Sequence, residues 1–251
     1  MSSPDFQLFT STRYDHLLLQ IPANSSHWPI PDASPSPFYM LPYHRDRMLQ
    51  AAERFQWPKA ISSISGPSGF SFLLQKLKEN IDMKSPTPLR VKILVSREGE
   101  INVETNPTPQ VPAGNLFPFR LPPPSSALND FCPSSLTGGA LILGPNESIP
   151  GDPQKGSSPW PILLDTAKTQ PSPYTSHKTT SRDMYNLARE RVGIEDMAEK
   201  TEVLVVSEKD GEIMEGSLTS VFFWRDGSWL TPEAGSGGQV GTTRRWGLEK
   251  G

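Results

Sequence analysis

The sequence is poor in cysteine, has no long hydrophobic run and carries no excess of basic charge. Cys132 is the single cysteine among 251 residues, so neither an intrachain disulfide nor a thiolate zinc cage can form. We therefore expect a protein of a reducing compartment, located in the cytoplasm. No apolar run approaches the ~20 residues that a membrane span needs. The N-terminus lacks a basic region followed by an apolar stretch, so no signal peptide is predicted.

The charge balance and the histidine pattern exclude further classes of function. The chain has 24 basic and 27 acidic residues, a formal net charge of −3. Binding of nucleic acid or of anionic membranes requires a basic excess, so neither partner is predicted. The histidines are scattered with no pair at ligand spacing, and we predict no metal site. A Walker A loop and a G-x-S-x-G elbow are also absent.

Proline marks the organisation of the chain. The sequence contains 27 prolines, over twice the usual ~5%, and they concentrate between Asn106 and Pro161, where no hydrophobic period persists. This composition is typical of a linker. We predict a small N-terminal α/β domain over residues 1–124, a Pro/Gly/Ser-rich linker over 125–158, and a C-terminal domain over 159–251.

Hydrophobic periodicity predicts an α+β fold. Before the linker, helical spacing appears over residues 41–55 and 70–81, and two strands over 90–105 flank a turn at 97–100. After the linker we expect a strand over 160–165. A helix should follow over 181–192, capped by Thr180 with Asp183 and closed by Gly193. Two hairpins are predicted to turn at Asp210-Gly211 and Asp226-Gly227.

Three segments of the C-terminal part suggest chemistry when they are taken together. Lys178 precedes the predicted helix and is flanked by small hydroxyl residues; alone, it is more simply a solvated loop lysine. Glu215 lies in a hairpin strand, and alone it is more simply an outward-facing carboxylate. The glycine turn over 237–241 leads into Thr242 and Thr243 at a predicted helix start, where free N–H groups can cradle a phosphate; the plainer alternative is a glycine-rich loop with a helix cap. A reactive lysine, a carboxylate and a phosphate cup are the parts that pyridoxal 5′-phosphate requires.

At these residues the sequence resembles the fold-type IV (class IV aminotransferase-like) pyridoxal-phosphate enzymes. SHKTTSRDMYNLAR is similar to their lysine segment, EGSLTSVFF to their glutamate segment and GGQVGTTRRW to their phosphate loop. YHRDRM, residues 43–48, resembles their H-x-x-R-L helix, and FTSTRYD, residues 9–15, resembles the N-terminal strand of the fungal 4-amino-4-deoxychorismate lyase branch. The resemblance implies a two-domain fold like that of D-amino acid aminotransferase, with a small α/β domain and a larger mixed β domain.

The resemblance also implies roles for individual residues. Lys178 matches the Schiff-base lysine and proton shuttle, and Glu215 matches the partner of the pyridine nitrogen. Ser11 falls where the lyases carry a hydroxyl near the leaving group. Arg13 is either a ligand of a substrate carboxylate or an exposed strand charge. The remaining matches contact the cofactor: Arg47, Gly241, Thr242 and Thr243 at the phosphate, and Ser220 in place of the family's usual asparagine.

The implied activity is cleavage of 4-amino-4-deoxychorismate to 4-aminobenzoate and pyruvate, a step toward folate, by a homodimer. A class IV aminotransferase acting on D- or branched-chain amino acids is the alternative enzyme. A non-catalytic relative that serves in binding is the alternative of another class. Relatives continue beyond the phosphate loop with a helix and strands, so we expect the C-terminal domain of this chain to be incomplete and its activity reduced. Tyr185 is either a contact of the cofactor's phenolic oxygen or, more simply, a core tyrosine.

Overall fold

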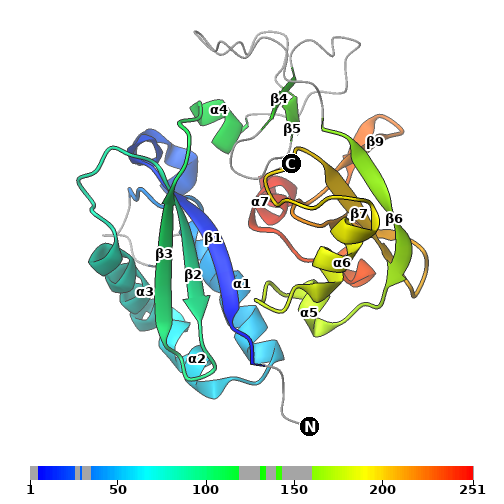
Figure 1. The fold of residues 1–251 in the computed structure, drawn as a ribbon. Helices are drawn as coiled ribbons and strands as arrows, with labels where there is room; N and C mark the ends of the chain where they lie inside the picture. Colours follow the sequence, from blue (N-terminus) through cyan, green and yellow to red (C-terminus); the bar gives the residue numbers. More distant parts are fainter. Residues whose placement is uncertain are drawn as a thin grey trace. The chain divides into compact units, whose positions relative to one another are not determined.

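The computed structural model divides into two compact units, each assembled from separate stretches of the chain (Figure 1). The structure describes residues 5–25, 29, 35–118, 131–133, 140–142 and 160–250. Unit 1 comprises Met1–Pro109, Pro173–Arg182 and Val240–Gly251, and unit 2 comprises Gln110–Ser172 and Asp183–Gln239. The predicted linker boundaries near 124 and 158 lie outside the described residues, and the three-part division stays a prediction.

Unit 1 contains a three-stranded antiparallel sheet in the order β1-β2-β3. Its strands are β1 (Leu8–Tyr14), β2 (Leu89–Val95) and β3 (Ile101–Pro107). Gly99 has a φ of 82° in the β2–β3 turn, a backbone region that glycine adopts without steric cost. The predicted hairpin is therefore confirmed. Alternate side chains, including Val91 and Ile93, point into the core of the unit.

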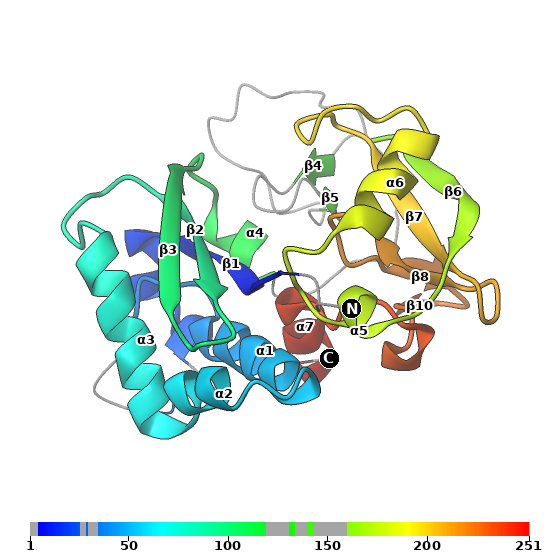
Figure 2. The ribbon, with the colours of Figure 1, turned by 60° about the horizontal axis from the view of Figure 1, so that its bottom comes forward.

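Three helices cover that apolar face of the sheet (Figure 2). They are α1 (Leu41–Arg54), α2 (Pro58–Ile64) and α3 (Gly66–Asn80), and α1 and α3 correspond to the two predicted helices. Helix α2 was not predicted; it begins with Pro58, whose fixed φ suits a first helical turn. Two short 3-10 helices, η1 (His16–Gln20) and η2 (Pro22–Ser25), follow β1.

One of the two later stretches that belong to unit 1, Pro173–Arg182, pairs with its N-terminal strand. Helix α5 (Pro173–Ser176) leads into residues 178–180, which lie along the free edge of β1. The Phe9 N–H donates to the Lys178 carbonyl at 3.0 Å, and the Thr180 N–H donates to the Gln7 carbonyl at 2.9 Å. The Thr180 hydroxyl accepts from the Gln7 N–H. The prediction that Thr180 caps the following helix is thus wrong, because its polar groups bond to the N-terminal strand instead.

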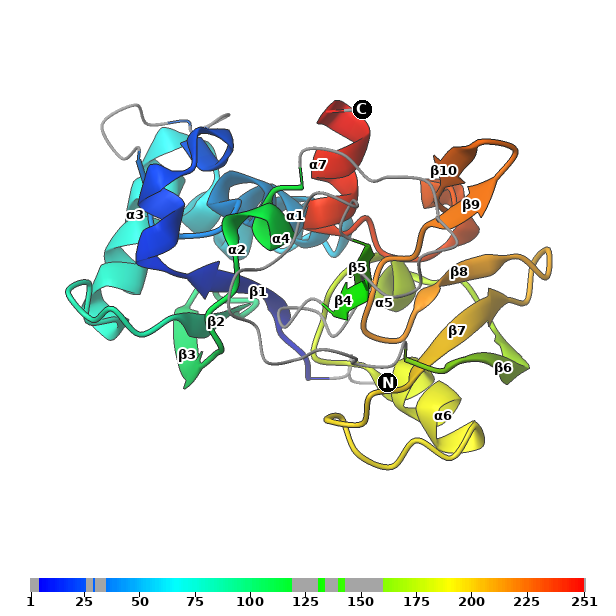
Figure 3. The same cartoon turned by 90° about the horizontal axis from the view of Figure 1, so that it is seen from above.

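Unit 2 is built on a mixed sheet in the order β6-β7-β8. Strands β6 (Ile162–Thr169) and β7 (Glu202–Ser207) are parallel, and β8 (Ile213–Gly216) is antiparallel to β7. Helix α6 (Asp183–Arg191) packs on β6 and β7 (Figure 3) and contributes Tyr185 and Ala188 to the core. Gly193, at a φ of 79°, follows the helix as predicted.

The remaining elements of unit 2 are short. Asp226 and Gly227 have φ values of 51° and 79°, the two left-handed residues of a type I′ turn, so the last predicted hairpin is confirmed. Its strands are β9 (Phe223–Arg225) and β10 (Ser228–Leu230). The others are α4 (Ala113–Leu116), β4 (Phe131–Pro133), β5 (Ala140–Ile142) and η5 (Ala234–Ser236). Within the described residues, no helix has the length and apolar character to cross a membrane, and no acidic, histidine or cysteine cluster could hold a metal.

Candidate functional site

Lys178 is held against the N-terminal strand of unit 1. Its carbonyl accepts the Phe9 N–H, and its Nζ lies 5.2 Å from the centroid of the Phe9 ring. The side chain is half-buried. A cation over an aromatic face is attracted by the ring quadrupole. The interpretation of Lys178 as an ordinary solvated loop lysine therefore does not hold, because its backbone and its amine both contact β1.

Arg47, Thr10 and His44 form a polar group between β1 and α1. Arg47 Nη2 donates to Thr10 Oγ1, and Thr10 Oγ1 lies 2.6 Å from His44 Nδ1. Burial lowers the pKa of His44 well below its usual value, and the charges of Arg47 and Lys178 lower it further. The imidazole is therefore neutral. Thr10 Oγ1 already accepts a hydrogen bond from Arg47, which favours donation of its own proton to His44 Nδ1. With Thr10 as the donor, the imidazole proton is on Nε2. Among the described residues, none accepts a hydrogen bond from that buried Nε2.

Ser11 and Arg13 lie on the opposite face of β1 from Thr10, because side chains alternate along a strand. Arg13 is fully buried, so its interpretation as an exposed strand charge is wrong. Its Nε donates to Asp15 Oδ2 and its Nη2 to the Pro109 carbonyl, both at 2.8 Å. Within the described part of the chain, neither Arg13 Nη1 nor Ser11 Oγ has a hydrogen-bond partner, although both atoms are buried. Such atoms are costly to leave unpaired, and they are suited to a polar ligand.

The predicted phosphate cup is the start of helix α7 (Thr242–Lys250) in unit 1. The Arg245 N–H donates to the Gly241 carbonyl at 2.9 Å and closes the first turn. Gly241 and Thr242 are buried, whereas Thr243 is exposed. The N-terminal N–H groups of a helix lack partners within it and attract anions. The predicted helix start is confirmed, while the phosphate contact stays a prediction.

Glu215 is a buried carboxylate of β8 in unit 2, not an outward-facing one. The Tyr185 hydroxyl donates to its Oε1, and the Gln239 N–H donates to the same oxygen at 3.0 Å. Gln239 Nε2 in turn donates to the Tyr185 hydroxyl at 3.2 Å. Tyr185 is a core residue, which was the simpler of the two predicted interpretations, and its hydroxyl also orients Glu215. The contribution of Gln239 was missed, because nothing in the local pattern marks it.

Two glycines permit this arrangement around Glu215. A Cβ on Gly238 would lie 2.6 Å from the Met214 carbonyl oxygen, so only glycine lets the loop approach β8 closely enough for the Gln239 N–H to reach the carboxylate. A Cβ on Gly216 would lie 2.5 Å from Thr219 Oγ1. Gly238, which belongs to the glycine turn that was predicted to form a phosphate cup, therefore allows close packing on β8.

Glu202 fixes the loop that follows Glu215 and leads to Ser220. Its carboxylate accepts the Ser217 hydroxyl at 2.6 Å and the Thr219 hydroxyl at 2.8 Å, and it also accepts two backbone N–H groups of the loop. Arg189 donates to Ser217 Oγ from α6. Ser220 itself is half-buried. A buried acid at the start of a strand is not distinctive in sequence, and the loop-holding role of Glu202 was not predicted.

Comparison with known proteins finds similarity to one family of enzymes. Residues 140–250 match the family model described as amino-transferase class IV. The chain is 27% identical over 176 residues to an aminodeoxychorismate lyase of Saccharomyces cerevisiae, an alignment that covers 64% of this chain and 42% of that protein. The chain thus spans less than half the length of this relative. The resemblance drawn from the motifs is confirmed as a similarity: residues 140–250 match the class IV aminotransferase model.

Solved structures share the fold. A protein from Mesorhizobium loti described as an amino-acid aminotransferase aligns with a TM-score of 0.55 and 19% identity, covering 98% of this chain and 84% of that one. One from Thermotoga maritima described as a branched-chain amino acid aminotransferase aligns with a TM-score of 0.52 and 15% identity, covering 96% and 61%. At such identities the likeness concerns the fold alone, and it confirms the predicted fold-type IV α+β class.

The described residues fit the cofactor on which this family in general depends, pyridoxal phosphate. Unit 1 offers an amine at Lys178, a guanidinium at Arg47 and the N-terminus of α7 at Thr242, which match an aldehyde and a phosphate. The buried Nε2 of His44, in the same unit, has no hydrogen-bond partner among the described residues and adds a further polar atom. Unit 2 offers the oriented carboxylate of Glu215, which matches a protonated pyridine nitrogen.

Proposed function

We propose that the chain is a pyridoxal-phosphate-dependent lyase that converts 4-amino-4-deoxychorismate to 4-aminobenzoate and pyruvate. The carrying observation is the polar face of β1. The strand that holds the Lys178 segment also presents Ser11 Oγ and Arg13 Nη1, both buried and without a hydrogen-bond partner among the described residues. The similarity to the yeast lyase supports the same activity.

In this proposal the cofactor is pyridoxal phosphate, and each of its polar groups has a residue of this chain as partner. Lys178 bonds its aldehyde carbon, and Glu215 accepts from its pyridine nitrogen. Its phosphate is bound by Arg47, Thr242 and Thr243, with the N–H groups that follow Gly241, and Ser220 lies in the loop that supplies a further cofactor contact. Bound pyridoxal phosphate supplies an electron sink for a carbanion at the carbon that bears the substrate nitrogen.

The chain's own residues would carry the proton transfers and the substrate contacts. Lys178 Nζ, released when the substrate's amino group takes its place, would accept the proton from the carbon that bears that amino group. The ether bond to the enolpyruvyl group then breaks, and the Ser11 hydroxyl donates a proton to the departing group, which leaves as pyruvate. Arg13 Nη1 binds a substrate carboxylate through a charge-assisted hydrogen bond. Loss of the ether makes the ring aromatic and drives the reaction forward.

The first experiment locates the lysine. The protein is mixed with pyridoxal phosphate, reduced with borohydride and digested, and the modified peptide is identified by mass spectrometry. We expect the pyridoxyl group on Lys178, and its loss in Lys178→Ala. Lys168→Ala is the matched control, because Lys168 is an exposed lysine of β6 in unit 2. A label that stays on another lysine would refute the assignment.

A class IV aminotransferase for D- or branched-chain amino acids is the second candidate, and the family match to residues 140–250 favours it. The two activities differ in their need for an acceptor. A lyase releases pyruvate and 4-aminobenzoate from aminodeoxychorismate alone, whereas an aminotransferase requires a keto acid to accept the amino group. Formation of both products without any keto acid is the expected result. Turnover that starts only after 2-oxoglutarate or pyruvate is added would favour the aminotransferase.

A further inference from the structure

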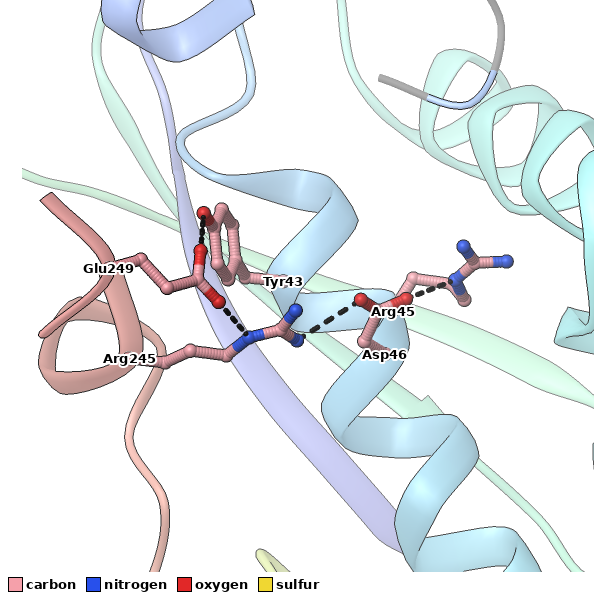
Figure 4. Close-up of polar contacts among 5 residues, drawn as sticks. All are labelled: Tyr43, Arg45, Asp46, Arg245 and Glu249. Carbon is pink, nitrogen blue, oxygen red and sulfur yellow. Dashed lines mark hydrogen bonds and ion pairs between the residues drawn. The ribbon is translucent and has the colours of Figure 1, made fainter. Parts of the chain in front are cut away.

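Helices α1 and α7 are joined by a network of four charged and aromatic side chains in unit 1 (Figure 4). Arg245 Nη1 lies 3.1 Å from Asp46 Oδ2, and Arg245 Nε donates to Glu249 Oε1 at 2.9 Å. Glu249 Oε2 accepts the Tyr43 hydroxyl at 2.5 Å, and the Arg245 guanidinium lies 4.6 Å from the centroid of the Tyr43 ring. We call these residues, Tyr43, Asp46, Arg245 and Glu249, the α1–α7 clasp.

Arg245 is the central member of the clasp. Arg245 contacts both carboxylates and the ring, and its planar fork suits such simultaneous contacts. Burial raises the pKa of Tyr43 to about 12, with the bond to Glu249 acting in the same direction. The phenol therefore keeps its proton and donates it. Asp46 is further paired with Arg45 at 3.0 Å within α1.

The clasp lies next to both predicted phosphate ligands, Arg47 in α1 and the N-terminus of α7. Asp46 directly precedes Arg47 in α1, and Arg245 lies in the first turn of α7, three residues after Thr242. These helices are about 200 residues apart in sequence, since the Asp46–Arg245 contact spans 199 positions. A guanidinium and a helix N-terminus bind one anion together only if their separation is held.

We propose that the α1–α7 clasp is a positioning device that sets Arg47 against the N-terminus of α7 for binding of the cofactor's phosphate. The inference rests on the proposed function, because that function supplies the phosphate. The clasp residues need no contact with the phosphate themselves; they act through the two helices. Opening the clasp therefore weakens binding of the phosphate group selectively and leaves the rest of the cofactor's contacts in place.

The test compares two ligands that differ by the phosphate alone. Apo protein is titrated with pyridoxal phosphate and with pyridoxal, and the two dissociation constants are measured for wild type, Asp46→Asn, Glu249→Gln and Tyr43→Phe. Inorganic phosphate, as a competitor of pyridoxal phosphate, reports the anion contacts independently of the lysine. Glu79→Gln is the matched control. The Lys76–Glu79 pair has a similar N–O distance of 2.9 Å and a similar exposure, and both of its residues belong to α3.

We expect each single clasp variant to weaken pyridoxal phosphate and inorganic phosphate by about two- to fivefold, the range of a partly exposed ion pair. Asp46→Asn combined with Glu249→Gln should reach roughly tenfold. Pyridoxal affinity should stay unchanged, and Glu79→Gln should alter none of the three ligands. Tyr43→Phe removes a single hydroxyl and keeps the ring, so it tests the clasp even if a charge variant fails to fold.

Two results would overturn the inference. One is an undiminished preference for pyridoxal phosphate over pyridoxal in the clasp variants. The other is a parallel loss of both ligands, which would make the clasp merely structural. A wild-type protein with no preference for pyridoxal phosphate over pyridoxal would instead contradict the proposed function itself.

Discussion

The hydroxyl of Thr10 should contribute more to stability than its size suggests, because two side chains depend on it. Thr10→Val keeps the shape of the side chain and removes the acceptor of Arg47 together with the hydrogen-bond partner of His44 Nδ1. A hydrogen bond to a charged group contributes about 1.5–3 kcal/mol, and a buried acceptor that is left unsatisfied costs about 1–3 kcal/mol. Partial relaxation offsets some of this cost, so we expect a loss of about 2–4 kcal/mol in the free energy of unfolding.

Urea denaturation of the purified variants measures this loss, and the same strand provides its control. Thr12 is also buried on β1, and its hydroxyl donates chiefly to the Tyr39 carbonyl at 2.6 Å, with a longer contact of 3.5 Å to the Arg13 carbonyl. Thr12→Val should cost only about 1 kcal/mol. Thr10→Ser, which keeps the hydroxyl, should recover most of the stability of the wild type. If Thr10→Val is no more destabilising than Thr12→Val, the coupled arrangement of Thr10, His44 and Arg47 is refuted.

Further predictions concern the two polar faces and the buried histidine. Glu215→Gln should fold normally and lose most turnover. Tyr185→Phe should lower turnover by a smaller factor, because it removes one of the two groups that orient the carboxylate. Near-normal steady-state rates in both variants would contradict the role of Glu215. Ser11→Ala should lower kcat by about 10²-fold or more and leave KM little changed, as expected when a proton donor is lost. Arg13→Lys should mainly raise KM, because Arg13 binds the substrate. The reverse pattern would exchange the two roles. Because the folded-state pKa of His44 lies well below 6.5, its contribution to stability is complete above that pH and is lost as the pH falls toward the folded pKa. Unfolding free energies at pH 7.5 and 5.5 should therefore differ more for wild type than for His44→Gln, and an equal difference would show that another group is responsible.

Local patterns predicted most of the elements because their causes lie within a few residues. Apolar residues at helical spacing marked α1 and α3, and the Gly99 and Asp226-Gly227 turns depend on backbone angles that few residues adopt. Helix α2 has only seven residues, too few for a period to emerge, and it was missed. The supposed cap at Thr180 failed for a different reason: its hydroxyl bonds to Gln7, 173 positions away, and no local pattern contains that contact.

For the candidate site, the sequence alone determined which chemical groups are present and in what order along the chain. Lys178, Glu215 and Arg47 were singled out because reactive amines, acids and phosphate ligands recur in short motifs. Only the tertiary structure decided what each group touches. Arg47 meets Thr10 across 37 positions, and Gln239 reaches Glu215 because Gly238 permits close approach to β8. Such hydrogen bonds depend on how strands and helices pack, and packing joins residues whose separation in sequence carries no pattern.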